Sequence, residues 1–70
     1  MTQERRALVV DSDLDSRDLI RETLVADGFA VRAAEGGEAA MASLQGEPVD
    51  LVFTASSLPD MTGLALLEAI

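Results

Sequence analysis

The stretch Ala7-Leu8-Val9-Val10-Asp11-Ser12-Asp13 decides the fold class of this chain. Four consecutive apolar residues, two of them β-branched, are typical of a parallel strand that is buried on both faces. The polar residues that follow at once predict a turn, so the strand should end at Val10. Strands of this kind occur in sheets covered by helices, and the rest of the chain should therefore alternate strands with helices.

A helix is predicted after this strand, from Ser16 to about Ala26, because apolar residues recur there at helical spacing. Asp15 is the expected N-cap, since a carboxylate at that position accepts hydrogen bonds from free backbone amides. Gly28 is expected to end the helix in a left-handed conformation. The side chains expected to face the sheet are Leu19, Ile20 and Leu24.

The rest of the chain continues the alternation. The expected elements are an edge strand over 29–33, a helix from Glu38 to about Leu44, a buried strand over 49–54, a loop over 55–63 and a third helix from Leu64 to Ile70. The order β-α-β-α-β-α predicts a parallel sheet with right-handed crossovers and helices on its faces. We therefore expect a single α/β domain over residues 1–70.

The composition excludes several kinds of function. The 70 residues contain no Cys and no His, which excludes disulfides, Cys-based zinc sites and thiol or imidazole catalysis. A formal net charge of −8, with five Arg and no Lys, disfavours nucleic acid and anionic membranes as partners. No apolar run approaches the ~20 residues that a membrane-spanning helix needs. We expect a cytoplasmic protein with a protein partner.

Polar residues follow two strands that should be neighbours. Asp11, Ser12 and Asp13 come after the first strand, and the loop from Ala55 to Ser57 comes after the third. Ligands of α/β sheets gather at the carboxyl ends of the strands, and clustered carboxylates suit Mg²⁺ there. The alternative is that Asp11 and Asp13 only cap the following helix. Composition alone favours this capping role.

Three stretches together form a more specific pattern. They are Leu8-Val9-Val10-Asp11-Ser12-Asp13, the Arg17 that follows, and Asp50-Leu51-Val52-Phe53 leading into Leu58-Pro59-Asp60-Met61-Thr62-Gly63-Leu64. From about Arg6 to Ile70 the chain resembles the CheY-like receiver domain of bacterial response regulators. The resemblance implies a truncated flavodoxin-like (CheY-like) three-layer α/β/α unit with parallel strand order 2-1-3. It also implies a role in the phosphorelays of two-component signal transduction.

The resemblance implies a degenerate site. The acidic pair of the family falls on Asp11 and Ser12, so its second carboxylate is missing. The phosphoacceptor, four residues before Pro59, falls on Ala55, which cannot take a phosphoryl group. Ser57 falls where the family supplies a backbone carbonyl to the metal. With Asp13 as a substitute ligand beside Asp11, we expect weak Mg²⁺ binding at most, and no other cofactor.

Three functions follow from this pattern. The leading hypothesis is a non-enzymatic, phosphorylation-independent receiver-like module that acts through protein contacts. The first alternative is a fragment of a longer response regulator with a separate DNA-binding or enzymatic output domain. The second is a working phosphoacceptor. It would need a hydroxyl near Ala55 as nucleophile, and the sequence offers no His, Lys or Cys to activate one.

The strand order 2-1-3 leaves the third strand at an exposed edge. Unprotected apolar edges are templates for pairing with another chain, and the third helix adds further apolar side chains. We therefore expect a homodimer, because closed two-fold symmetry is the commonest arrangement of identical chains. The residues expected at its interface are Val52, Phe53, Leu64, Leu67 and Ile70.

Overall fold

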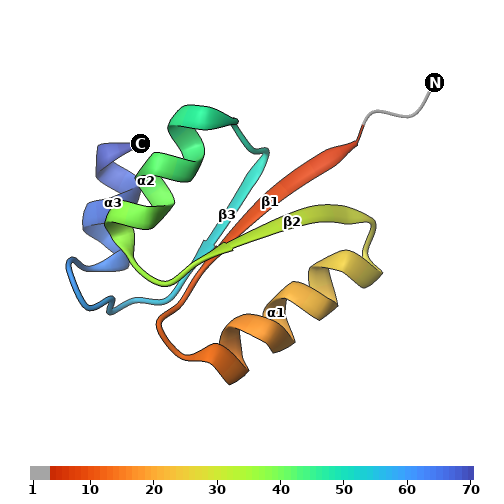
Figure 1. The fold of residues 1–70 in the computed structure, drawn as a ribbon, viewed down its shortest axis with the longest axis horizontal. Coiled ribbons are helices and arrows are strands. Elements are labelled where there is room, and N and C mark those ends of the chain that lie inside the picture. Colours follow the sequence, from red (N-terminus) through yellow and green to blue (C-terminus); the bar gives the residue numbers. More distant parts are fainter. Residues whose placement is uncertain (1–3) are drawn as a thin grey trace.

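The computed structural model describes residues 4–70, and Figure 1 shows its strands and helices in alternating order. The elements are β1 (Arg5–Val10), α1 (Leu14–Ala26), β2 (Phe29–Ala34), α2 (Gly37–Gly46), β3 (Leu51–Thr54) and α3 (Gly63–Ala69). Both neighbours of β1 pair with it in parallel, in the order β2-β1-β3. The predicted α/β class and the predicted strand order are both confirmed.

The central strand is the best-buried part of the chain. All four residues from Ala7 to Val10 are fully buried, as the unbroken apolar run predicts. Their side chains alternate between the faces of the sheet. Leu8 and Val10 enter the main core, which they share with Ala34, Ala40, Leu58 and Leu66. Helices α2 and α3 therefore close one face of the sheet over a continuous apolar cluster.

Helix α1 covers the opposite face, where it packs on β2 and β1 (Figure 1). None of its residues is fully buried, and Ile20 and Leu24 are only partly covered. The prediction that Leu19 faces the sheet is wrong, because 66% of this residue is exposed. The stripe of α1 that meets the sheet runs instead through Arg17, Ile20 and Leu24.

Several element boundaries differ from the sequence-based expectation by one or two residues. Helix α1 starts two residues early because Asp13, and not Asp15, is its N-cap and accepts a hydrogen bond from the Ser16 amide at 3.2 Å. Strand β3 starts only at Leu51. The predicted end of α1 is confirmed, since Gly28 has φ of 95° and no other described residue has a left-handed backbone.

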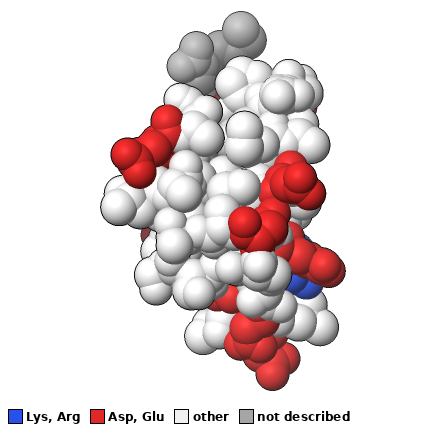
Figure 2. Space-filling view, turned by 90° about the vertical axis from the view of Figure 1, so that its left-hand side faces the viewer, with Lys and Arg blue, Asp and Glu red and all other residues white. Residues whose placement is uncertain are grey.

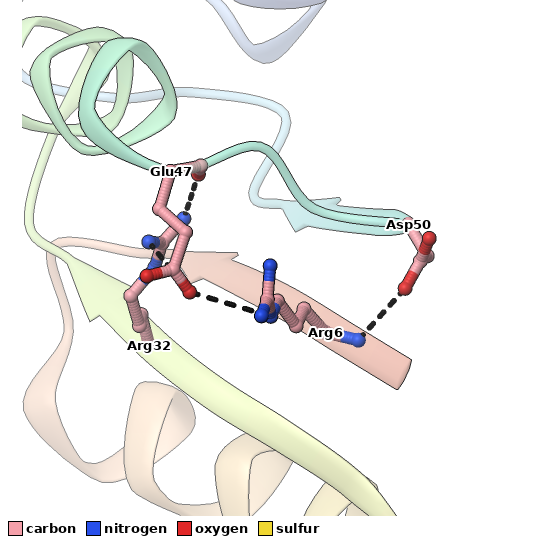
Figure 3. Close-up of polar contacts among 4 residues, drawn as sticks. All are labelled: Arg6, Arg32, Glu47 and Asp50. Atoms are coloured by element: carbon pink, nitrogen blue, oxygen red, sulfur yellow. Dashed lines mark hydrogen bonds and ion pairs between the residues drawn. The ribbon is translucent and has the colours of Figure 1, made fainter. Parts of the chain in front are cut away.

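The amino end of the sheet is joined to the end of α2 by a small ion network (Figure 3). The Glu47 carboxylate lies 3.3 Å from Arg6 Nε on β1 and 3.7 Å from Arg32 Nη1 on β2. Arg32 also donates a hydrogen bond to the Glu47 carbonyl. The Arg6 amide donates to the Asp50 carboxylate at 2.9 Å, just before β3. These groups are partly exposed, so each ion pair contributes about 0.2–1 kcal/mol.

Within residues 4–70, no helix is both long enough and apolar enough to cross a membrane.

Candidate functional site at the carboxyl end of the sheet

The ends of β1 and β3 bring Asp11 and Ala55 together. Val10 is in register with Thr54, so the residue after each strand lies at the same edge of the sheet. The Ala55 amide donates a hydrogen bond to the Val10 carbonyl at 2.9 Å. Asp11 and Ala55 are both half-buried. The sequence therefore predicted correctly that the β1–α1 and β3–α3 loops meet at one corner.

Asp11 is held in place by its backbone and by one side-chain oxygen. Its amide donates to the Ala34 carbonyl at 3.1 Å, and its carbonyl accepts from Arg17 Nη1 at 3.0 Å. One carboxylate oxygen accepts the Asp13 amide at 3.0 Å. The Arg17 side chain is only 13% exposed and lies 4.0 Å from Glu35. Arg17, which belongs to the family pattern, thus fixes the β1–α1 loop by its hydrogen bond to the Asp11 carbonyl.

The Asp13 carboxylate is directed to the N-terminus of α1. One of its oxygens accepts the Ser16 hydroxyl at 2.7 Å and the Ser16 amide at 3.2 Å. These hydrogen bonds hold the pKa of Asp13 below its usual value, and the bond from the Ser16 hydroxyl has the largest effect. The capping alternative is therefore confirmed for Asp13. Ser12 is exposed beside it and adds no carboxylate.

The β3–α3 loop is closed by its own backbone. Ser57 and Thr62 form an antiparallel bridge, with hydrogen bonds of 3.0 Å from Leu58 N to the Met61 carbonyl and from Gly63 N to the Ser56 carbonyl. A Cβ atom added to Gly63 would lie 2.2 Å from the Ala55 carbonyl oxygen. Glycine is therefore required where the chain enters α3, and the loop holds Ala55 firmly against the helix.

Asp60 joins this loop to α2, a role that the sequence analysis missed. Its two carboxylate oxygens accept the amides of Gly37 at 2.8 Å and Glu38 at 2.9 Å. The N-cap of α2 is Gly36, which has no side chain to do this. The hydrogen bonds from Glu38 and Gly37 hold the pKa of Asp60 below its usual value. Gly36 and Gly37 at the start of α2 offer no capping side chain, and this could have indicated that a residue distant in the sequence caps the helix.

Met61 packs into the space left beside Gly37. A Cβ atom on Gly37 would lie 2.3 Å from the Met61 sulfur. Met61 is partly buried and packs against the main core. The start of α2 and the tip of the β3–α3 loop are therefore joined by the two hydrogen bonds to Asp60 and by the packing of Met61.

The donor set does not fit the Mg²⁺ ion that the family resemblance implies. Within residues 4–70, no three acidic side chains gather as ligands for a metal. The Asp13 carboxylate accepts from Ser16 at the start of α1, and one Asp11 carboxylate oxygen accepts the Asp13 amide. Mg²⁺ requires near-octahedral oxygen coordination and gives up its water reluctantly. We assign no chemical step to a metal in this chain.

The five residues expected at an interface do not lie on one surface. In parallel strands the residues in register share a face, so Val52 lies beside Leu8 on the α2 and α3 side. It packs there against the main core and is half-buried. Phe53 lies beside Val9 on the α1 side. The other three, Leu64, Leu67 and Ile70, are exposed on α3 or at its end.

The sequence matches the response regulator receiver domain over residues 7–70. The chain therefore belongs to the family of receiver domains that work in two-component signal transduction. Its fold agrees with a solved member, the chemotaxis response regulator CheY4 of Vibrio cholerae, with a TM-score of 0.91 and 28% sequence identity. That alignment covers 97% of this chain and 57% of CheY4.

Two curated relatives are longer proteins. The response regulator protein PilR of Pseudomonas aeruginosa is 38% identical over 66 residues, which are 94% of this chain and 15% of PilR. The regulatory protein VanRc of Enterococcus gallinarum is 34% identical over 65 residues, which are 93% of this chain and 28% of VanRc. The chain thus spans less than a third of either relative.

Proposed function

We propose that this chain is a receiver-like protein-interaction module of two-component signalling whose state is not set by phosphorylation. It acts in the cytoplasm and as a non-enzyme. The observation that carries the proposal is the methyl side chain of Ala55 at the end of β3, beside Asp11. The family pattern assigns the phosphoacceptor to this position, four residues before Pro59. A methyl group has no lone pair to attack a phosphoryl donor.

Two further features support the proposal. Asp13 is occupied as a helix cap, and Ser12 leaves the second acidic position of the pattern neutral. One of the two hydroxyls adjacent to Ala55 in the sequence, that of Thr54, donates to the Ala55 carbonyl at 3.0 Å and so is engaged in the loop. The net charge of −8 also favours a protein partner over nucleic acid.

Intact mass spectrometry tests the proposal. The chain is incubated with acetyl phosphate and Mg²⁺, and we expect its mass to stay that of the unmodified protein. A stoichiometric phosphoryl adduct that neutral hydroxylamine removes would be an acyl phosphate on some carboxylate. That outcome would overturn the proposal and favour a working phosphoacceptor.

Ser56→Ala and Ser57→Ala variants extend the test to the nearby hydroxyls. Both side chains lie in the loop directly after Ala55. An adduct that resists neutral hydroxylamine and that either substitution removes would place the phosphoryl group on a serine, and would equally overturn the proposal. Substitution of Thr54 is the third variant of this set and serves as its control, because the Thr54 hydroxyl already donates a hydrogen bond to the Ala55 carbonyl.

The lengths of the relatives favour a second proposal, in which this segment regulates an output domain elsewhere in a longer polypeptide. The segment matched in PilR is 15% of that protein, and the segment matched in VanRc is 28%. The intact mass of the native gene product separates the two proposals. A mass of 7.4 kDa fits the first and a larger mass fits the second.

A further inference from the structure

The junction between α1 and β2 contains the one Asp-Gly pair of the sequence, Asp27-Gly28. The other Asp residues are all followed by Ser, Leu or Met. In an Asp-Gly pair the amide nitrogen of the glycine can attack the aspartate side chain and close a five-membered imide ring, because glycine has no side chain that obstructs the approach. The end of α1 is therefore the place where the backbone is best suited to react with its own side chain.

The surroundings of this pair leave room for the reaction. Asp27 and Gly28 are both exposed, and no heavy atom lies within 4 Å of a Cβ atom built on Gly28. Asp27 is the C-cap of α1, and its backbone is what the fold holds. Its amide donates to the carbonyls of Thr23 at 3.2 Å and Leu24 at 3.1 Å, and its carbonyl accepts from Arg5 Nη2 at 3.4 Å. Water can reach both reacting groups.

The closed end of α1 protects the pair in two ways. The Gly28 amide, which would be the nucleophile, donates a hydrogen bond to the Val25 carbonyl at 3.0 Å. Asp27 has ψ of 1°, so the Gly28 nitrogen eclipses the Asp27 nitrogen. Ring closure requires rotation about the Cα–C bond until the Gly28 nitrogen eclipses the Asp27 Cβ atom instead. The last turn of α1 must therefore open before the imide can form.

Several features make this turn easy to open. Helix α1 has no fully buried residue, and Val25 in its last turn is 51% exposed. The last turn contains no basic residue, while the Asp27 carboxylate lies at the negative end of the helix dipole, where a negative charge is unfavourable. Exposed helix ends open at a small fraction of the free energy of global unfolding. The protected and the reactive conformations should therefore interchange in the folded chain.

We propose that Asp27 is a self-modification site, which isomerises to isoaspartate when the last turn of α1 opens. The Gly28 nitrogen gives up its proton and bonds to Cγ of Asp27, and the hydroxyl of the carboxyl group leaves with that proton as water. Water then adds to one of the two imide carbonyls. Cleavage of the bond between nitrogen and Cγ restores aspartate, whereas cleavage at the main-chain carbon gives isoaspartate. The reaction needs no reactant except water.

The product would alter the joint between α1 and β2. Isoaspartate adds one methylene group to the main chain, directly before β2. Phe29 is in register with Arg5, whose guanidinium lies 4.7 Å from the centre of the Phe29 ring. The longer link shifts Gly28 relative to the helix, so the hydrogen bond from Gly28 to Val25 is lost if this register is kept. We expect the end of α1 to lose order while the centre of the sheet stays intact.

The charge of the chain supplies a way to detect the intermediate. Ring closure removes one carboxylate from a chain with a net charge of −8. Figure 2 shows the side of the molecule where α3 lies, with acidic side chains and very little basic area. The imide form should therefore leave an anion exchanger earlier than the unmodified chain, and it is lighter by one water. Isoaspartate has the mass of aspartate and must be identified by its chemistry.

Peptide mapping after storage tests the proposal. The chain is kept at neutral pH with and without urea and is then digested with a peptidase that cleaves before aspartate but not before isoaspartate. We expect isoaspartate at residue 27 of the folded chain before any other site, and formation about tenfold faster or more in urea, where every molecule is open. Absence of isoaspartate at residue 27 in the folded chain would overturn the proposal. Earlier isomerisation at Asp11 or Asp15, which precede serine, would do the same.

Two variants separate the chemistry from the opening of the helix. Asp27→Glu keeps the charge at the C-cap but would require a six-membered ring, which closes far more slowly, so we expect no product. A product that forms at the same rate in this control would rule out the imide route. Ala26→Lys places a cation at an exposed position in the last turn and should slow the reaction about two- to fivefold in the folded chain but not in urea. If hydrogen exchange of the Gly28 amide slowed in Ala26→Lys while the reaction did not, local opening would have no role.

Discussion

Asp13 and Asp60 both hold the N-terminus of a helix with a carboxylate, but over very different distances along the chain. Asp13 accepts the amide of Ser16, three residues away, in the helix that it begins. Asp60 accepts the amides of Gly37 and Glu38, which lie 23 and 22 residues before it in the sequence, at the start of α2. The β1–α1 loop is thus closed locally, whereas the β3–α3 loop depends on α2. Substitutions in the β3–α3 loop should therefore destabilise a larger part of the chain than substitutions in the β1–α1 loop.

The largest effect is expected for Gly63→Ala in the β3–α3 loop. The new Cβ atom would lie 2.2 Å from the Ala55 carbonyl oxygen, and backbone atoms cannot move aside as a side chain can. We expect the free energy of unfolding to fall by about 2–3 kcal/mol, the cost of severe overpacking. Urea denaturation measures it.

Gly46→Ala is the matched control for that substitution. No atom lies within 4 Å of a Cβ added at Gly46, and the residue lies in the last turn of α2. We expect the free energy of unfolding to rise by about 0.5–1 kcal/mol, because alanine restricts the unfolded chain. Equal losses for Gly63→Ala and Gly46→Ala would contradict the proposed fit of the loop.

The second prediction compares the two carboxylates themselves. Asp60→Ala should weaken the start of α2 and the β3–α3 loop together, so amides of both segments should lose protection from hydrogen exchange. Asp13→Ala should affect only the first turn of α1. Native-state hydrogen exchange followed by NMR separates the two. If Asp60→Ala left the protection of Gly37 and Glu38 unchanged, the distant cap would have no energetic role.

The third prediction concerns acid. The pKa values of Asp13 and Asp60 are both lowered in the folded chain, from a reference value of 3.8. A lowered folded-state pKa contributes stability above the unfolded-state pKa, and this contribution is lost as the pH falls through the folded-state pKa. Stability should therefore decrease below about pH 4. In Asp13→Asn and Asp60→Asn chains, thermal melts between pH 5 and pH 2 should show a shallower decrease.

The smallest effect is expected for Mg²⁺. Bound ligand raises stability in proportion to ln(1 + [L]/Kd), so a weak site gives almost no change in Tm at millimolar Mg²⁺. The chain with both Ser12→Asp and Ala55→Asp places two more carboxylates beside Asp11 and should show a larger rise. Differential scanning fluorimetry measures both. A rise of several degrees in the unchanged chain would mean that Asp11 and Asp13 bind the ion better than their hydrogen bonds suggest.

Much of the fold could be predicted because the deciding signals are local. The apolar run from Ala7 to Val10 indicated the buried central strand, and the alternation of strands and helices indicated the parallel sheet. Local signals failed where two capping residues competed. Asp13 and Asp15 both suit an N-cap, and the hydroxyl of Ser16 favours Asp13.

The misses at the site have a different cause. Asp60 caps a helix that precedes it by more than 20 residues, and no periodicity in the sequence carries that contact. The five residues of the predicted interface lie on two faces of the sheet, and this follows from how side chains alternate along a strand. Neighbours in β3 alternate between faces, so Val52 and Phe53 had to separate. The roles assigned to Ala55, Ser12 and Ser57 stay predictions.

The central place of β1 has a consequence for synthesis on the ribosome. This strand emerges before the other described elements, yet one of its edges pairs with β3, which emerges after three further elements. Until then the nascent chain carries a fully apolar strand, Ala7 to Val10, with an unpaired side. Unpaired strand edges favour aggregation of incomplete chains. A pause in synthesis before Thr54 has emerged is therefore expected to favour aggregation more than a later pause.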